Sequence, residues 1–413
     1  MLLGAIADDF TGATDLATNL VARGYRTVVR TGLGGDPAVP ADVDALVVAL
    51  RSRTAPVEAA VADTRAALAQ LRAAGCARVY LKYCSTFDST PAGNIGPALD
   101  VLMTELAAPV TIAVPAFPAA GRTVYQGHLF VGEQLLSDSP MRHHPLTPMT
   151  DSDLVRLLAA QTRHPVVRTT LDRVRAGATA LRDTLTADPG TPRIHVLDAI
   201  DESDLATIAA AAEPLPLWSG GSGLALGLPP GPATDAREIP VVPGHRVVLA
   251  GSASAATRRQ VAAVADRMPS RRLDLAALRT DPAGTVDDLV TWAAAQWRQD
   301  TPVLIYAVGS LDHVEPARPG TEPASVLVER ALAGCAVGLA GRGARQFLVA
   351  GGETSGAVTA ALGVTALRIG PAVAPGVAWA AGTTAAGDPV DLALKSGNFG
   401  ADDIFVTAWD RLR

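Results

Sequence analysis

The sequence predicts an α/β protein of two domains, each built on a mostly parallel sheet flanked by helices. In both halves of the chain, short apolar runs alternate with longer helical patterns, which is typical of parallel sheets. The 413 residues are 48% hydrophobic, which is ample material for two cores. A segment rich in proline and glycine, residues 214–243, separates the two halves. We therefore expect domains at 1–230 and 231–413, with the functional site in the cleft between them.

Each half contains apolar runs of strand length, which are followed by segments of helical periodicity. In the first half the predicted strands are 2–7, 44–50, 79–83, 110–114 and 193–197, and the predicted helices are 13–23 and 57–74. In the second half the predicted strands are 246–250, 303–308, 346–350 and 390–394, with further closing strands just before the last of these. The predicted helices are 257–267, 286–298, 324–339 and one after Thr354. Residues 121–148 are weakly patterned, and we expect loops there.

Charge and composition argue against several classes of partner. A net charge of -6 and a pI near 5.7 provide no basic field for a polyanionic duplex, so no nucleic-acid partner is expected. No uninterrupted apolar stretch approaches the ~18 to 20 residues of a membrane span, so no membrane partner is expected either. The start of the chain lacks the basic residues of a signal peptide, and the three cysteines have no C-x-x-C spacing. We expect a cytoplasmic protein that acts on small molecules, with a homodimer left open as its assembly.

Three predicted strands of the first half end in loops that are rich in charge and hydroxyl groups. Adjacent carboxylates, Asp8 and Asp9, follow the first strand at the start of a helix. Guanidinium groups suited to a substrate carboxylate follow the second strand, at Arg51 and Arg53. The third loop combines a cation, hydroxyl groups and a carboxylate, at Lys82, Ser85, Thr86 and Asp88. Ligands gather at the carboxyl edge of open parallel sheets, so these loops predict a pocket for a small anion with several hydroxyl groups.

Each of these loops also has a purely structural interpretation. One of the two aspartates, or Thr11, could simply cap the helix that follows. The arginines could be ordinary surface residues, and turns of serine, threonine and aspartate are common in loops. The three loops together favour a ligand site, because all three follow strands at one predicted sheet edge.

Two predicted strands of the second half run into glycine-rich turns that precede helices. The first turn reads GSAS at 251–254, and the second reads GGETSG at 351–356. Exposed amides at such helix starts favour phosphate oxygens, and glycine permits close backbone approach. A third loop, KSGNFG at 395–400, adds a cation and further glycines. The three loops predict a nucleotide site, with Lys395 as a cation that offsets phosphate charge.

The standard nucleotide signatures do not occur in the sequence. It contains neither G-x-x-x-x-G-K-[ST] nor the protein-kinase signature set. Gly221, Gly223 and Gly227 have the wrong last spacing for a dinucleotide fingerprint and fall in the predicted linker, which disfavours an oxidoreductase. The histidines show no spacing typical of metal ligands, and we assign no residue to a metal.

Motifs spread along the whole chain together resemble the four-carbon acid sugar kinase family. They are IADDFTGATD, KYCSTFDST with GNIGP, GRTVYQGHLFVG, GGSG, GGETSG and LALKSGNFG. The middle motifs, including HPLTPM at 144–149, are particularly similar to the 3-oxo-tetronate kinase branch of that family. One departure is visible, because the family commonly has G-S-C-S where this chain has Ala253.

The resemblance implies an N-terminal domain that binds the acid sugar and a C-terminal domain that binds ATP. It implies transfer of the γ-phosphoryl group of ATP, with Mg²⁺, to the 4-hydroxyl of a 3-oxo-tetronate. It assigns the sugar acid to Asp8, Asp9, Arg53, Lys82 and Asp88, and Asp8 or Asp9 would orient the attacking hydroxyl. It assigns the nucleotide to Ser252, Ser254, Gly351, Gly352, Glu353, Thr354, Gly397 and Asn398. D-threonate and D-erythronate stay open as alternative substrates. A sensor that binds sugar acid and nucleotide without turnover stays open as another class of function.

Overall fold

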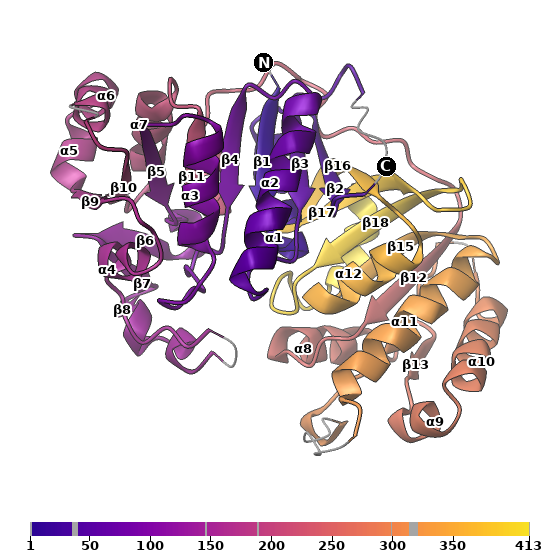
Figure 1. The fold of residues 1–413 in the computed structure, drawn as a ribbon. Coiled ribbons are helices and arrows are strands. Elements are labelled where there is room, and N and C mark those ends of the chain that lie inside the picture. The colour runs from indigo at the N-terminus through magenta and orange to yellow at the C-terminus, as the bar shows by residue number, and fades with distance from the viewer. Residues whose placement is uncertain are drawn as a thin grey trace. The chain divides into compact units, whose positions relative to one another are not determined.

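The computed structural model describes residues 2–34, 40–144, 147–187, 190–298, 300–313 and 321–412; residues 145 and 146 of the HPLTPM motif lie outside these ranges. The chain forms two compact units, Met1–Ala236 and Arg237–Arg413 (Figure 1). Each unit is built on a mostly parallel sheet with flanking helices, which confirms the predicted fold class. No helix in the described ranges is long and apolar enough to cross a membrane.

The sheet of unit 1 is parallel at every described pairing of its strands. In spatial order the strands are β2 (Thr27–Thr31), β3 (Ala45–Ala49), β1 (Leu3–Ala7), β4 (Arg78–Lys82), β11 (Leu217–Gly220), β5 (Val110–Val114), β10 (Arg193–Leu197) and β9 (Val166–Thr169). All side chains of β1, β3 and β5 are buried, as expected for parallel strands covered on both faces. The neighbouring strands β3, β1, β4 and β11 therefore end at one edge of the sheet.

Helices flank the sheet of unit 1 (Figure 1). They are α1 (Phe10–Ala22), α2 (Val57–Ala73), α3 (Ile95–Glu105), α4 (Leu154–Ala159), α5 (Leu171–Arg175), α6 (Ala178–Thr186) and α7 (Glu202–Ala212). Helix α1 starts directly after Asp9, whose carboxylate accepts a hydrogen bond from the first turn. It stops before Gly24, which adopts a φ of 89° and so turns the chain out of the helix.

Two segments of unit 1 differ from the sequence-based expectation. Residues 121–148, expected to be loops, contain a small antiparallel sheet of β6 (Arg122–Tyr125), β7 (His128–Val131) and β8 (Gln134–Leu135). The predicted linker contains strand β11 and a short 3-10 segment, Ser222–Gly227. Gly220, Gly221 and Gly223 pack so closely against the backbone of residues 114–117 that a Cβ would not fit. These glycines therefore serve tight packing inside unit 1, and they do not mark a flexible linker.

The sheet of unit 2 is parallel except for two strands at one side. In spatial order the strands are β13 (Ser270–Arg272), β14 (Val303–Tyr306), β12 (His245–Ala250), β15 (Ala344–Ala350), β18 (Pro389–Lys395), β17 (Val377–Thr383) and β16 (Ala366–Ala374). The last two strands pair antiparallel. The helices are α8 (Ala255–Val264), α9 (Leu275–Thr280), α10 (Pro282–Ala295), α11 (Ala324–Ala340), α12 (Gly352–Ala361) and α13 (Ile404–Thr407). Strands β12, β15 and β18 are parallel neighbours, so their following loops meet at one edge.

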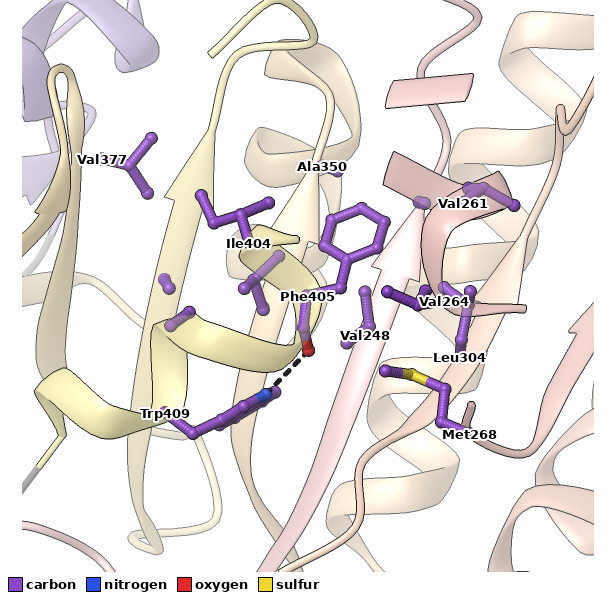
Figure 2. Packing of buried hydrophobic residues seen from close by; sticks show 14 of the residues in the cluster. Val248, Val261, Val264, Met268, Leu304, Ala350, Val377, Ile404, Phe405 and Trp409 are labelled. Atoms are coloured by element: carbon purple, nitrogen blue, oxygen red, sulfur yellow. Dashed lines mark hydrogen bonds between the residues drawn. The ribbon is translucent and has the colours of Figure 1, made fainter. Parts of the chain in front are cut away.

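A buried cluster of unit 2 packs the helices α8 and α13 against the sheet (Figure 2). Phe405 of α13 is fully buried in this cluster, together with Val248 of β12 and Val264 of α8. The indole N–H of Trp409 donates to the Phe405 carbonyl at 2.9 Å, and that of Trp379 donates to the Ala408 carbonyl at 2.9 Å. The large aromatic side chains are thus buried with their polar atoms satisfied.

Truncation of Phe405 should therefore destabilise the protein strongly. We expect Phe405→Ala to lower the free energy of unfolding by about 3–5 kcal/mol, because it leaves a cavity in a packed core. The neighbouring Val406 is 42% exposed, so Val406→Ala should change the free energy by no more than about 0.5 kcal/mol. Urea unfolding followed by tryptophan fluorescence measures both. Equal effects of the two variants would contradict the packing described.

Candidate functional site

The carboxyl edge of the unit 1 sheet joins three of the predicted loops. Asp8 lies directly after β1, between the neighbouring strands β3 and β4. Its backbone N–H donates to the Lys82 carbonyl at 3.0 Å, and its own carbonyl accepts from the Ser52 N–H at 3.0 Å. The loops after β1, β3 and β4 are therefore linked by main-chain hydrogen bonds at Asp8.

Arg53 lies at the centre of a cluster of three carboxylates. Its Nε and Nη2 donate to the two oxygens of Asp8 at 2.8 and 2.9 Å, which is a bidentate pair. Nη2 also lies 3.0 Å from Asp9 Oδ1, and Nη1 lies 3.7 Å from Asp88 Oδ2. Burial by itself would lower the pKa of Arg53, but the carboxylates of Asp8 and Asp9 raise that pKa well above its usual value. The guanidinium stays charged, and most of its donors are directed at carboxylates of the protein itself.

Asp9 combines a structural role with a free oxygen. Its Oδ1 accepts from the Gly12 N–H at 2.8 Å, so Asp9 is the residue that caps α1. Among the described residues, Asp9 Oδ2 has no hydrogen-bond partner. The Asp9 side chain is 33% exposed, against 14% for Asp8. Of the two adjacent aspartates, Asp9 is thus the one that offers an oxygen to a ligand.

Lys82 is a buried cation at the end of β4, with 3% of the residue exposed. A Cβ added at Gly12 would collide with both Asp9 Oδ1 and Lys82 Nζ, so the ammonium lies over the first turn of α1. In the described part of the chain, Lys82 Nζ makes no hydrogen bond and no ion pair within 4 Å. A buried charge without such partners is costly, which favours a ligand role for this ammonium.

The loop after β4 is strained at two successive residues. Phe87 and Asp88 have φ values of 64° and 35°, which are uncommon for residues with a Cβ. Thr86 Oγ1 donates to Asp88 Oδ1 at 2.8 Å, and the Phe87 ring packs edge-on against Tyr83. These contacts hold the Asp88 carboxylate near Arg53. Backbone strain of this kind is concentrated at functional sites, which supports the prediction for this loop.

Two of the predicted residues lie apart from the Arg53 cluster. Arg51 is exposed and makes no ion pair with any described residue. Ser85 is partly exposed and lies against Gly221, the residue that follows β11. A cavity of about 20 Å³ is lined by Asp8, Arg53, Asp88 and their neighbours, and it has room for roughly one water molecule. A sugar acid would therefore not fit into this cavity behind the cluster.

Sequence reasoning missed residues that position the cluster. Asn94 of the GNIGP motif donates to the Ser52 carbonyl at 2.7 Å and to the Ala55 carbonyl at 2.8 Å, which fixes the loop that carries Arg53. Asp15 of α1 accepts a hydrogen bond from Ser222 Oγ. Burial raises the pKa of Asp15, while Lys82 and the Ser222 hydroxyl act in the opposite direction. The helical spacing of Asp9, Gly12 and Asp15 was a signal that could have identified Asp15.

At the carboxyl edge of the unit 2 sheet, the loops after β12 and β18 are in direct contact. Ser254 Oγ accepts from the Thr257 N–H at 3.2 Å, which caps α8, and donates to the Gly397 carbonyl at 2.6 Å. Ser252 Oγ accepts from the Ser254 N–H at 3.1 Å. A Cβ at Gly397 would collide with Ser252 Oγ, so this position requires glycine. The structure therefore brings the predicted residues Ser252, Ser254 and Gly397 together.

The loop after β15 opens into the start of α12. Gly351 has a φ of 130°, and a Cβ there would lie 2.8 Å from Thr354 Oγ1. Helix α12 has no side-chain cap, and the amides of Gly352, Glu353 and Thr354 have no hydrogen-bond partner in the described part of the chain. Free amides at a helix start are suited to phosphate oxygens.

Lys395 ends β18 and is 1% exposed. Its Nζ lies 3.3 Å from both Thr257 Oγ1 and the Gly397 carbonyl, and burial lowers its pKa to about 8. Thr257, which sequence reasoning missed, also donates to the Gly397 carbonyl at 2.8 Å. Lys395 and Thr257 thus tie the Gly397 loop to α8. The side chains of Glu353 and Asn398 are exposed and make no hydrogen bond with the described residues.

Comparison with known proteins identifies the two units. A family model described as a sugar-binding N-terminal domain matches residues 3–228. A second model, described as a nucleotide-binding C-terminal domain, matches residues 247–405. The chain belongs to the four-carbon acid sugar kinase family.

Relatives within this family align with the chain from end to end. The 3-oxo-tetronate kinase of Cupriavidus necator is 50% identical, over 100% of this chain and 97% of the relative. The 3-oxo-tetronate kinase of Burkholderia multivorans is 50% identical, over 98% of this chain and 96% of the relative. A solved structure from Salmonella typhimurium LT2, of a protein provisionally named a tRNA synthase, is 40% identical with a TM-score of 0.88, over 98% of each chain. The family resemblance seen in the sequence is therefore confirmed.

The lowered pKa of Lys395 makes the stability of this acid sugar kinase family member dependent on pH. Between about pH 8 and 10.5 the unfolded chain holds a proton on Lys395 that the folded protein has lost, so folding becomes more favourable as the pH rises. We expect Lys395→Met to be stabilising relative to the wild type below pH 8. This difference should shrink by up to about 1.4 kcal/mol per pH unit above it. Urea unfolding of both proteins at pH 7 to 10 measures the trend, and a constant difference would contradict it.

Proposed function

We propose that this chain is an ATP-dependent kinase that phosphorylates the 4-hydroxyl of 3-oxo-tetronate. The observation that carries the proposal is the end-to-end alignment, at 50% identity, with relatives named 3-oxo-tetronate kinase. The geometry of the units supports it. Unit 1 holds carboxylates and a free ammonium at its sheet edge, which suits an anion with hydroxyl groups, and unit 2 holds free amides, which suit phosphates.

Asp9 is the better candidate for the residue that accepts the hydroxyl proton. Arg53 engages both oxygens of Asp8, whereas Asp9 keeps Oδ2 free among the described residues. In the proposed reaction, the bond from the γ-phosphorus to the ADP oxygen breaks and the sugar oxygen forms the new bond. The hydroxyl proton passes to Asp9. Such a transfer depends mainly on alignment and on neutralisation of phosphate charge.

ATP is proposed to bind with its phosphates at the start of α12, beside the Ser252 and Ser254 hydroxyls. Mg²⁺ belongs to the proposal as the Mg-ATP complex, because this ion is usually held by substrate phosphates and one or two carboxylates. No group of three or more His, Cys, Asp or Glu residues in the described ranges is arranged to hold a metal ion. The proposal therefore assigns no protein ligand to Mg²⁺.

Several finer expectations stay predictions. They are a cleft shared by the two sites, domain limits at 230 and 231, a homodimer and a cytoplasmic location. D-threonate and D-erythronate stay alternative substrates, and the sensor stays an alternative class. The oxidoreductase alternative loses support, because Gly221 and Gly223 serve packing inside unit 1. The tRNA synthase name stays with the Salmonella protein, since a net charge of -6 does not favour an RNA substrate.

A substrate screen tests the reaction and the substrate together. We expect Mg-ATP to yield ADP with 3-oxo-tetronate at a higher kcat/KM than with D-threonate or D-erythronate. A coupled assay for ADP release measures all three. Preference for D-threonate or D-erythronate would show that the proposed substrate is wrong. Tight binding of tetronate and ATP without ADP release would favour the sensor.

Replacement of Asp9 tests its proposed role as proton acceptor. Asp9→Asn keeps the shape of the side chain and an oxygen for the Gly12 N–H, but it removes the basic oxygen. We expect kcat to fall by about 10²- to 10⁴-fold with little change in the KM for ATP. Glu58→Gln is a matched control, since Glu58 is an exposed acid in the first turn of α2. Near-normal kcat in Asp9→Asn would remove Asp9 from the catalytic role.

A further inference from the structure

The sugar acid carries a carboxylate, and the proposed function requires a cation with free donors to bind it. Arg53 has only Nη1 without a hydrogen bond among the described residues, because Nε and Nη2 donate to Asp8 and Nη2 also contacts Asp9. Nη1 itself lies 3.7 Å from Asp88 Oδ2. Arg51 is exposed and lies outside the Arg53 cluster. Arg53 therefore has no free pair of adjacent donors for the two oxygens of the substrate carboxylate, and Arg51 lies apart from the cluster.

Arg122 of the GRTVYQG motif lies at the same edge of the unit 1 sheet. It pairs with Phe117 in both directions, through backbone hydrogen bonds of 2.8 and 3.0 Å, in the loop that follows β5. Phe117 in turn packs directly on Gly223, the residue next to Ser222. These contacts connect Arg122, through Phe117 and Gly223, to Ser222, whose hydroxyl donates a hydrogen bond to Asp15.

The guanidinium of Arg122 is only partly used by the protein. Nη1 donates to the Ala120 carbonyl, but Nε is buried and has no hydrogen-bond partner. Among the described residues, no carboxylate lies within 4 Å of this guanidinium. A buried, unsatisfied N–H costs about 1–3 kcal/mol, so a structural role for Arg122 leaves this donor unexplained.

Lys82 is the second cation of this region with free donors. Burial raises the pKa of Asp15, and the positive charges of Lys82 and Arg122 act to lower it. Both cations therefore lie within electrostatic range of the Asp15 carboxylate. Lys82 Nζ lies over the start of α1, where Asp9 offers its free oxygen.

We propose that Arg122, together with Lys82, binds the carboxylate of the sugar acid, and that Arg53 instead organises the aspartates. The inference rests on the proposed function, because it takes a four-carbon acid as the ligand. A guanidinium with a free edge matches a carboxylate in a planar, two-bond geometry, and the ammonium adds a point charge. Arg122 is then a residue that selects an acid over a neutral sugar.

The test compares the charged substrate with a neutral analogue. Arg122→Gln removes the charge and keeps a polar side chain with N–H donors. We expect kcat/KM for the preferred tetronate to fall about 10- to 100-fold, mainly through KM, with the KM for ATP unchanged. The inhibition constant of the neutral tetronamide should change less than about twofold. Arg122→Lys should recover part of the lost affinity. Arg65→Gln, a control at an exposed arginine of α2, should behave as the wild type.

Equal losses for acid and amide would overturn the inference, since they would show that Arg122 only supports the loop. Unchanged kinetics for the acid would overturn it as well. If the wild type bound tetronate but released no ADP, the kinase proposal would fail independently. Calorimetric affinities of wild type and Arg122→Gln for tetronate and tetronamide would then decide the role of Arg122 in the same way.

Discussion

The ion cluster around Arg53 is the constraint on which the candidate sugar-acid site depends. Asp8, Asp9 and Asp88 would repel one another without a cation between them. The bidentate pair with Asp8 and the contacts to Asp9 and Asp88 hold the loops after β1, β3 and β4 in one arrangement. Loss of one partner from a fully buried ion pair costs about 3–5 kcal/mol. Arg53 is partly exposed, so its removal would cost less energy and still disperse the carboxylates.

The same construction recurs at the carboxyl edge of the unit 2 sheet, with hydroxyl groups and amides in place of carboxylates. Neighbouring parallel strands end in loops that contact each other, and a glycine stands where a Cβ would collide with a side chain from another part of the edge. Gly12 has this role in unit 1, and Gly397 has it in unit 2. The glycines of the motifs are therefore consequences of close packing between loops, which leaves polar groups facing outward from each edge.

Strands that form short buried runs between turn residues could be predicted from the sequence. Segments whose conformation depends on packing against distant residues could not. Strands β5 and β10 have the predicted limits: β5 reads VTIAV and is buried throughout, and β10 reads RIHVL and is buried after its first residue. Strand β11 lies in the predicted linker, because the glycine and proline around it are typical of a flexible segment. In the structure, close packing on residues 114–117 requires these glycines. At the site, Asp8, Asp9 and Arg53 could be foreseen because charges directly follow strands. Thr257 could not, because its partner Gly397 lies in a loop remote in sequence. Arg122 could not either, because only the structure shows that its Nε is buried without a partner. Asp15 had one local signal, its helical spacing from Asp9 and Gly12.

The distribution of lysine and arginine links the two sites. Of 35 basic residues, only Lys82 and Lys395 are lysines, which leaves 33 arginines by subtraction. Many of the arginines pair with carboxylates or carbonyls, a use that suits a planar fork of donors. Each lysine is the last residue of a central parallel strand, is at most 3% exposed, and has no carboxylate within 4 Å among the described residues. Lys82 Nζ makes no hydrogen bond among the described residues, and Lys395 Nζ donates to the hydroxyl of Thr257 and the carbonyl of Gly397, which are both neutral. Both lysines are thus buried cations at sheet edges that lack a carboxylate partner among the described residues, which is an environment suited to an anionic ligand.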